Sequence, residues 1–178
     1  MAQSEKTYSE ITEAETIIKE LCAKHKEVLW AVNPDVVVVL GIDNKKRGKK
    51  NKTMAKIIPI KGIEKVIMNL NKIKVQYAIE AYWSDWNAWG EALRQWVIFH
   101  ELLHIASEEG KTIKHDVQDF RIIVDKVGVN WAAPNKSLPN LLKDDVQFDK
   151  ELIPSTVEAL ETQEAEDEED DDKEKKEE

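Results

Sequence analysis

The stretch from Glu91 to His104, EALRQWVIFHELLH, decides the fold and the chemistry expected of this chain. His100 and His104 are four residues apart, so on a helix their Cβ atoms lie about 5–6 Å apart on one face. Two imidazoles at this spacing can bind one metal ion, and Glu101, which lies off that face, can deprotonate a metal-bound water. Ordinary hydrogen-bonding histidines are the alternative, yet this apolar segment holds two of only four histidines. The stretch therefore predicts a metal site on a helix, with Glu101 as general base.

A catalytic zinc site has three protein ligands and one position open for water. Candidates for the third ligand follow the motif closely, and they are Glu108, Glu109, His115, Asp116 and Asp119. We prefer His115, because it is expected to begin a second helix that packs against the first, and because imidazole matches the other two ligands. Asp119, one turn further along, would orient the His115 ring, unless it only adds a favourable charge at the helix start. Tyr77 and Tyr82 are both candidates for stabilising an oxyanion.

Hydrophobic periodicity predicts an α+β fold with a small sheet. The expected elements are a helix over residues 10–31, strands over 36–40, 55–60 and 74–82, and helices over 85–106 and 115–127. Asp85 is the expected N-cap of the second helix, Gly90 its weak point, and Gly128 the C-cap of the third. The strand over 74–82, which precedes the site helix, is expected to pair with an extended substrate.

The segments His100-Glu101-Leu102-Leu103-His104 and His115-Asp116-Val117-Gln118-Asp119-Phe120 resemble the putative phage metallopeptidase family, small HExxH zincins distantly similar to SprT-like metalloproteases. The resemblance is placed over residues 30–130, with residues 1–29 and those after about 145 outside it. It implies a zincin-like domain with a sheet of about three strands, an N-terminal helix, an HExxH helix and a following helix. It also implies one Zn²⁺ ion bound by His100, His104 and His115, with Glu101 as general base for the hydrolysis of a protein or peptide substrate. The expected domains are an N-terminal helix (1–29), a metallopeptidase domain (30–145), a C-terminal extension (146–160) and a disordered acidic tail (161–178).

The net charge of −9 belongs to the end of the chain. Residues 161–178 hold 12 acidic residues and 3 lysines, which leaves 23 acidic and 23 basic residues in the rest of the chain. Within residues 45–52 there are six basic side chains, namely Lys45, Lys46, Arg47, Lys49, Lys50 and Lys52. This loop is either a solvated turn or a contact for nucleic acid or an acidic partner.

The function expected is that of an intracellular zinc metallopeptidase. A single cysteine, Cys22, excludes a disulfide framework, and neither a signal peptide nor an apolar run long enough for a membrane is expected. The expected location is the cytoplasm, of the host cell if the protein is phage-encoded. The alternative is a non-catalytic, metal-stabilised binding module that contacts nucleic acid through residues 45–52. That module would have a closed four-ligand site, with Asp116 or Asp119 in place of the water.

Overall fold

The computed structural model describes residues 6–44, 53–107, 110–115, 119–134 and 136–154. A four-stranded mixed sheet organises the fold, in the order β1 (Lys6–Glu10), β2 (Val37–Asn44), β4 (Tyr77–Tyr82), β3 (Ala55–Pro59). The central pair, β2 and β4, is parallel, and both edge strands are antiparallel to their neighbours. The predicted α+β class is confirmed, as are the three predicted strands, although β2 extends further than expected. Strand β1 was not predicted, because all five of its residues are exposed and it lacks the apolar alternation of a half-buried strand.

Strand β4 lies in the interior of the sheet, so the predicted pairing of this strand with a substrate is wrong. Its backbone is paired with β2 on one side, in the register Val39 to Ile79, and with β3 on the other. Strand β3 is instead the edge strand on the side of the predicted site helix, which it contacts directly. Among the strands that the structure describes, β3 therefore forms the edge of the sheet on this side.

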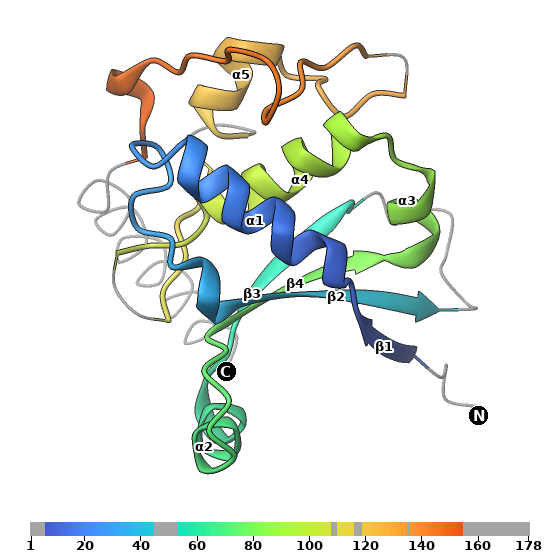
Figure 1. Ribbon diagram of the computed structural model, residues 1–178, viewed down its shortest axis with the longest axis vertical. Helices are drawn as coiled ribbons and strands as arrows, with labels where there is room; N and C mark the ends of the chain where they lie inside the picture. Colours follow the sequence, from blue (N-terminus) through green and yellow to red (C-terminus); the bar gives the residue numbers. More distant parts are fainter. Residues whose placement is uncertain (1–5, 45–52, 108–109, 116–118, 135, 155–178) are drawn as a thin grey trace, which may run out of the picture.

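Two long helices, α1 (Thr12–Lys24) and α4 (Glu91–Leu103), cross one face of the sheet and contact each other (Figure 1). Helix α1 buries Ala14, Ile18 and Leu21, and it begins later and ends earlier than the predicted helix over 10–31. Nearly all of α4 beyond its first turn is buried, because this helix lies between the sheet, α1 and the C-terminal residues. Residues before and after position 29 therefore contribute to one hydrophobic core. The predicted division into domains stays a prediction.

The remaining helices differ most from the sequence expectations. The predicted helix over 85–106 is two helices, α3 (Trp83–Ala88) and α4, because the chain is extended at Trp89 and Gly90. Asp85 therefore lies inside α3 and is not its N-cap. The predicted helix over 115–127 begins only at Arg121, as α5 (Arg121–Val127). Gly128 ends the helix as predicted, with a positive φ of +79°, although its ψ of 165° is not that of a left-handed helical cap. Helix α2 (Gly62–Leu70) was not predicted, and short 3₁₀ turns cover Pro34–Val36 and Lys150–Leu152.

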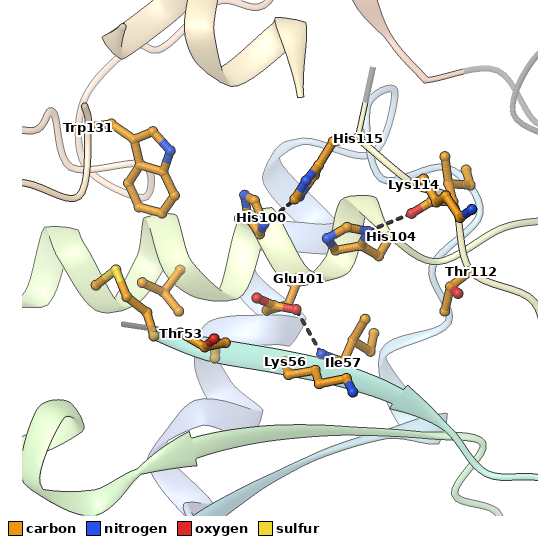
Figure 2. Close-up of a pocket in the computed structure, with 14 residues that line it drawn as sticks. Thr53, Lys56, Ile57, His100, Glu101, His104, Thr112, Lys114, His115 and Trp131 are labelled. Atoms are coloured by element: carbon orange, nitrogen blue, oxygen red, sulfur yellow. Dashed lines mark hydrogen bonds between the residues drawn. The ribbon is translucent and has the colours of Figure 1, made fainter. Parts of the chain in front are cut away.

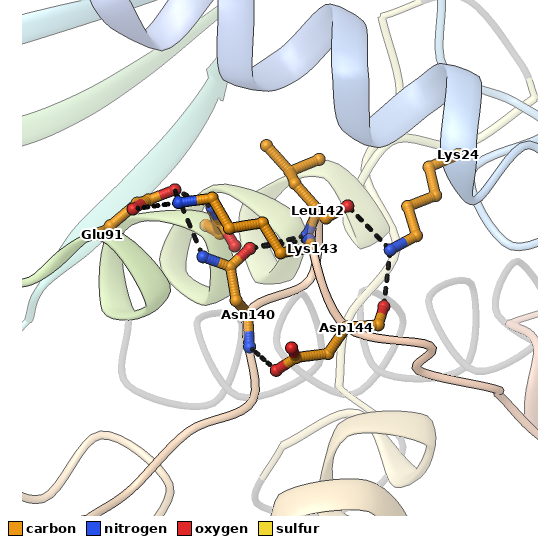
Figure 3. Close-up of polar contacts among 7 residues, drawn as sticks. Lys24, Glu91, Asn140, Leu142, Lys143 and Asp144 are labelled. Carbon is orange, nitrogen blue, oxygen red and sulfur yellow. Dashed lines mark hydrogen bonds and ion pairs between the residues drawn. The ribbon is translucent and has the colours of Figure 1, made fainter.

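The residues after α5 follow the surface of the helical layer and are attached to it by polar contacts (Figure 3). Lys24 at the end of α1 donates to the carbonyl oxygens of Leu142 (2.9 Å) and Asp144 (2.6 Å). Lys143 forms an ion pair of 2.9 Å with Glu91 at the start of α4. These contacts hold the C-terminal segment against both helices.

None of the helices in the described ranges is long and apolar enough for a bilayer crossing.

Candidate metal centre

Three histidines converge at the C-terminal end of α4 (Figure 2). His100 lies within α4, His104 is the residue that ends it, and His115 lies on the segment that precedes α5. One ring nitrogen from each histidine lies within 4.8 Å of the other two, and the Nε2 atoms of His100 and His115 are 3.1 Å apart. Two nitrogen ligands of one tetrahedral zinc ion are about 3.3–3.4 Å apart, given Zn–N distances of about 2.0–2.1 Å. The donor set and its spacing therefore fit one metal ion.

The hydrogen bond of His104 selects the tautomer that a metal ligand needs. Its Nδ1–H donates to the carbonyl oxygen of Ile113 at 2.5 Å, which leaves Nε2 as the lone-pair nitrogen. Burial lowers the pKa of His104 to about 4, despite that hydrogen bond. The ring is therefore neutral at physiological pH, and a neutral imidazole is the form that binds a metal.

Asp119 contacts His100, whereas the sequence analysis paired it with His115. The Oδ1 atom of Asp119 lies 3.0 Å from Nδ1 of His100, although the contact is not aligned as a hydrogen bond. Asp119 also accepts hydrogen bonds from the indole N–H of Trp131 (2.6 Å) and the backbone N–H of Phe120 (2.7 Å). Burial raises the pKa of Asp119, but the His100 contact and these hydrogen bonds outweigh it and hold the pKa below its usual value. The residue differs from its predicted role because the helix begins at Arg121, so Asp119 is not one helical turn from His115.

Glu101 is buried between α4 and the edge strand. Its side chain is only 6% exposed, and its Oε2 atom accepts a hydrogen bond of 2.8 Å from the backbone N–H of Ile57 on β3 (Figure 2). Burial raises the pKa of this carboxyl group, and the nearby His100 and the Ile57 hydrogen bond only partly oppose that. A raised carboxyl pKa suits a group that must accept and then release a proton near neutral pH.

A cavity of about 700 Å³ lies between β3 and α4 and contains all three histidines and Glu101. Val97, Met54 and Trp131 contribute apolar wall, while Lys56 and Lys114 add positive charge. Trp131 is buried, and the centre of its ring lies 5.7 Å from that of His100. The cavity thus places the imidazoles and the carboxyl group on one shared surface.

Several predicted residues are not brought to this cavity. The hydroxyl of Tyr77 accepts a hydrogen bond from the Gly110 N–H and donates one to the Lys111 carbonyl oxygen. These two bonds hold the loop after α4 in position. Neither Tyr77 nor Tyr82 lines the cavity. The other predicted ligand candidates (Glu108, Glu109 and Asp116) and the basic loop (Lys45, Lys46, Arg47, Lys49, Lys50 and Lys52) lie outside the described residues, so their roles stay predictions.

Sequence reasoning missed three residues that support this cluster. Trp131 bonds to Asp119, the Ile113 carbonyl bonds to His104, and the Ile57 amide bonds to Glu101. Two of these contacts use backbone atoms, which leave no signal in side-chain identity. Trp131 follows His115 by sixteen residues with no recognisable spacing, so only the tertiary structure could identify it.

One of the comparisons with known proteins identifies a family for this chain. A family model described as "Putative phage metallopeptidase" matches residues 6–144. No curated protein and no solved structure matches the chain. The family match begins at β1 and includes α1, so the placement of the resemblance over residues 30–130, with residues 1–29 outside it, was too narrow.

Proposed function

Because the chain belongs to the putative phage metallopeptidase family, we propose that it is a zinc-dependent peptidase with one ion held by His100, His104 and His115. The observation that carries the proposal is the convergence of three imidazoles beside a buried carboxyl group in one cavity. Imidazole ligands are typical of zinc, and three of them leave a position for water. The family supports a metal-dependent peptidase, and the choice of zinc is our own.

Glu101 is proposed as the general base. A zinc ion at this site would polarise the scissile carbonyl and lower the pKa of bound water to about 7. The Ile57 amide holds Oε2 of Glu101, so the carboxyl group keeps one orientation toward the cavity while Oε1 takes the proton. The same carboxyl group then delivers that proton to the leaving amine. Burial assists both steps, because it raises the pKa of Glu101 toward the working range.

We expect an extended substrate to lie along β3. This strand is the sheet edge beside the cavity, and Lys56 and Ile57 contribute to the cavity wall. Backbone groups at an open edge can pair with an added strand, while side-chain pockets supply specificity. The Ile57 amide is already bonded to Glu101, so pairing would use the other outward groups of the strand.

A matched set of variants tests the proposal. Glu101→Gln should keep about one zinc ion per chain and lose peptide hydrolysis by about 10²–10⁴-fold, the usual contribution of a general base. His104→Ala should lose the zinc, and Glu151→Gln, an exposed carboxylate elsewhere, should change neither property. Metal content by mass spectrometry and turnover of fluorogenic peptides measure both properties. Full turnover by Glu101→Gln would show that the assigned base is wrong.

The identity of the fourth ligand separates this proposal from a non-catalytic metal-stabilised module, because both sites have four ligands. After a thiol inhibitor is added to the zinc-loaded protein, X-ray absorption should show a sulfur neighbour about 2.3 Å from the zinc, because the thiolate replaces an exchangeable water. A closed site with a carboxylate as fourth ligand would favour the binding module. Asp119 is poorly suited to that place, because both its oxygens already contact Trp131, Phe120 or His100.

A further inference from the structure

Helix α2 turns its apolar side away from the rest of the protein. Four aliphatic side chains at helical spacing are more than half exposed, and we call them the α2 stripe: Ile63 (69%), Val66 (56%), Ile67 (52%) and Leu70 (78%). Lys65 and Met68, on the opposite side of the helix, are partly buried. In Figure 1, α2 projects from the sheet on the side away from α1 and α4.

This orientation is the reverse of that of an ordinary surface helix, which directs its apolar stripe to the core. None of the nine residues of α2 is buried, so the stripe adds nothing to the core. Ile73, just after the helix, is 47% exposed and extends the apolar surface. An exposed apolar patch with polar residues at its rim marks a contact with a protein or a membrane. The charge and the residue types of this segment distinguish between the two.

Lysines border the α2 stripe at both ends of the helix. Lys61 is the residue before α2, Lys72 and Lys74 follow it on either side of Ile73, and all three lysines are exposed. Residues 53–79 hold five lysines and one glutamate, a net charge of +4 in a chain whose total is −9. Exposed charges interact over a screening length of only about 8–10 Å, so this local positive charge governs what approaches α2. The last described residues, 150–154, lie at the other end of the molecule (Figure 1).

The residue types favour a bilayer over a protein partner. Protein interfaces are enriched in aromatic residues and arginine and depleted in lysine, and their energetic centres rarely use leucine or valine. Residues 61–74 contain no aromatic residue and no arginine. A nine-residue helix is about 14 Å long, and one face of it is much smaller than the roughly 800 Å² per partner of a stable protein interface. A second copy of α2 would place lysines beside lysines, whichever direction it ran.

A helix that lies in the surface of an anionic bilayer matches these features. Its aliphatic side chains enter the boundary between headgroups and acyl chains, about 5–10 Å deep, while lysines extend their amines to the lipid phosphates. The strength of such binding increases with the apolar area buried and with the attraction between basic residues and anionic lipids. A helix in this position does not cross the bilayer, so the short length of α2 is no obstacle.

We propose that α2 is a peripheral membrane-binding element that lies in the surface of an anionic bilayer. The α2 stripe and Ile73 enter the apolar boundary, and Lys61, Lys72 and Lys74 contact the anionic headgroups. The cavity that holds the three histidines is lined by other residues, so this binding does not depend on the proposed peptidase function.

Flotation of the full chain with phospholipid vesicles tests the proposal. At about 0.1 M salt the protein should float with vesicles of phosphatidylserine and phosphatidylcholine. Its affinity for vesicles of phosphatidylcholine alone should be about 10²-fold weaker, which corresponds to about 1 kcal/mol for each of the three lysines. The double substitution Ile67→Glu and Leu70→Glu should abolish flotation. Val129→Glu with Asn130→Glu adds the same charge at exposed residues elsewhere and should leave flotation intact.

A pair of lysine variants separates the local charge of α2 from the charge of the whole chain. Lys72→Gln with Lys74→Gln should weaken binding to the anionic vesicles by about 30-fold, at the same value per lysine. Lys126→Gln with Lys136→Gln removes two exposed lysines in and after α5 and should change the affinity by less than about twofold. Equal effects of the two pairs would show that the net charge, and not α2, controls binding.

Three further results would overturn the proposal. The first is an absence of flotation of the unchanged chain with the anionic vesicles. The second is flotation that the Ile67→Glu and Leu70→Glu variant keeps, since another surface would then bind the lipid. The third is a dimer in analytical ultracentrifugation that this variant loses, since a second copy would then cover the stripe. All the substituted residues are exposed, so an unchanged melting temperature checks that each variant keeps the fold.

Discussion

The contact between Asp119 and His100 leads to the sharpest prediction about the metal centre. Asp119→Asn keeps the size of the side chain but removes the charge that lies 3.0 Å from Nδ1 of His100. Loss of a partner that orients a metal-binding histidine weakens metal affinity by about 10–100-fold. That range corresponds to about 1.4–2.8 kcal/mol. We expect the zinc dissociation constant of Asp119→Asn to rise by this factor.

Trp131→Phe provides a graded version of the same test. Phenylalanine keeps an aromatic wall beside His100 but removes the 2.6 Å hydrogen bond from the indole N–H to Asp119. Asp119 would still accept the hydrogen bond from the Phe120 amide and contact His100, so only part of the lost bond energy should weaken metal affinity. We therefore expect the zinc dissociation constant to rise by about 3–10-fold. The same substitution in the Asp119→Asn background should have less than about a twofold effect, because the charge that Trp131 positions is gone.

Competition with a fluorescent zinc chelator measures these dissociation constants without any substrate. Asp125→Asn on α5 is the matched control, because this carboxylate is half exposed and its ion-pair partner among the described residues is its neighbour Lys126. An Asp119→Asn protein that binds zinc within about twofold of the unchanged chain would refute the orienting role of Asp119. A wild-type protein that binds no zinc would instead refute the metal site itself.

Three further predictions concern stability and reactivity. Gly41→Ala should lower the free energy of unfolding in urea by about 1–3 kcal/mol, because the new methyl group would collide with the indole ring of Trp83. Gly90→Ala is the control: a methyl group there meets no described atom within 4 Å, so the free energy of unfolding should change by less than about 0.5 kcal/mol. Burial raises the pKa of Cys22 to about 11, so iodoacetamide at pH 8 should alkylate the native protein slowly and the urea-unfolded protein quickly. Burial also lowers the pKa of His25, so the unfolded chain binds a proton that the folded chain does not, and stability should fall as the pH drops below about 6.5. The urea midpoint of His25→Gln should depend less on pH between 7 and 5 than that of the unchanged chain.

Local patterns predicted the elements whose residues form contacts within their own segment. The spacing of His100 and His104 anticipated a helix face that presents two imidazoles, and the valine-rich run anticipated β2. The same reasoning placed the start of α5 six residues too early, because Val117 and Phe120 fit a helical stripe by spacing alone. It also joined α3 to α4, because Gly90 in a helical pattern is only a weak signal of a break.

The sequence by itself determined the chemistry of the centre: two imidazoles and a carboxyl group at fixed helical offsets, a further histidine within reach, and the acidic end of the chain. The tertiary structure decided which groups support that chemistry, namely Trp131 behind Asp119, the Ile113 carbonyl at His104 and the Ile57 amide at Glu101. It also decided that β3 is an edge strand and that the apolar side chains of α2 (Ile63, Val66, Ile67 and Leu70) face outward. The physical reason is that helical periodicity depends on neighbours three or four residues apart, whereas these contacts join segments up to 44 residues apart and often use backbone atoms that every residue carries.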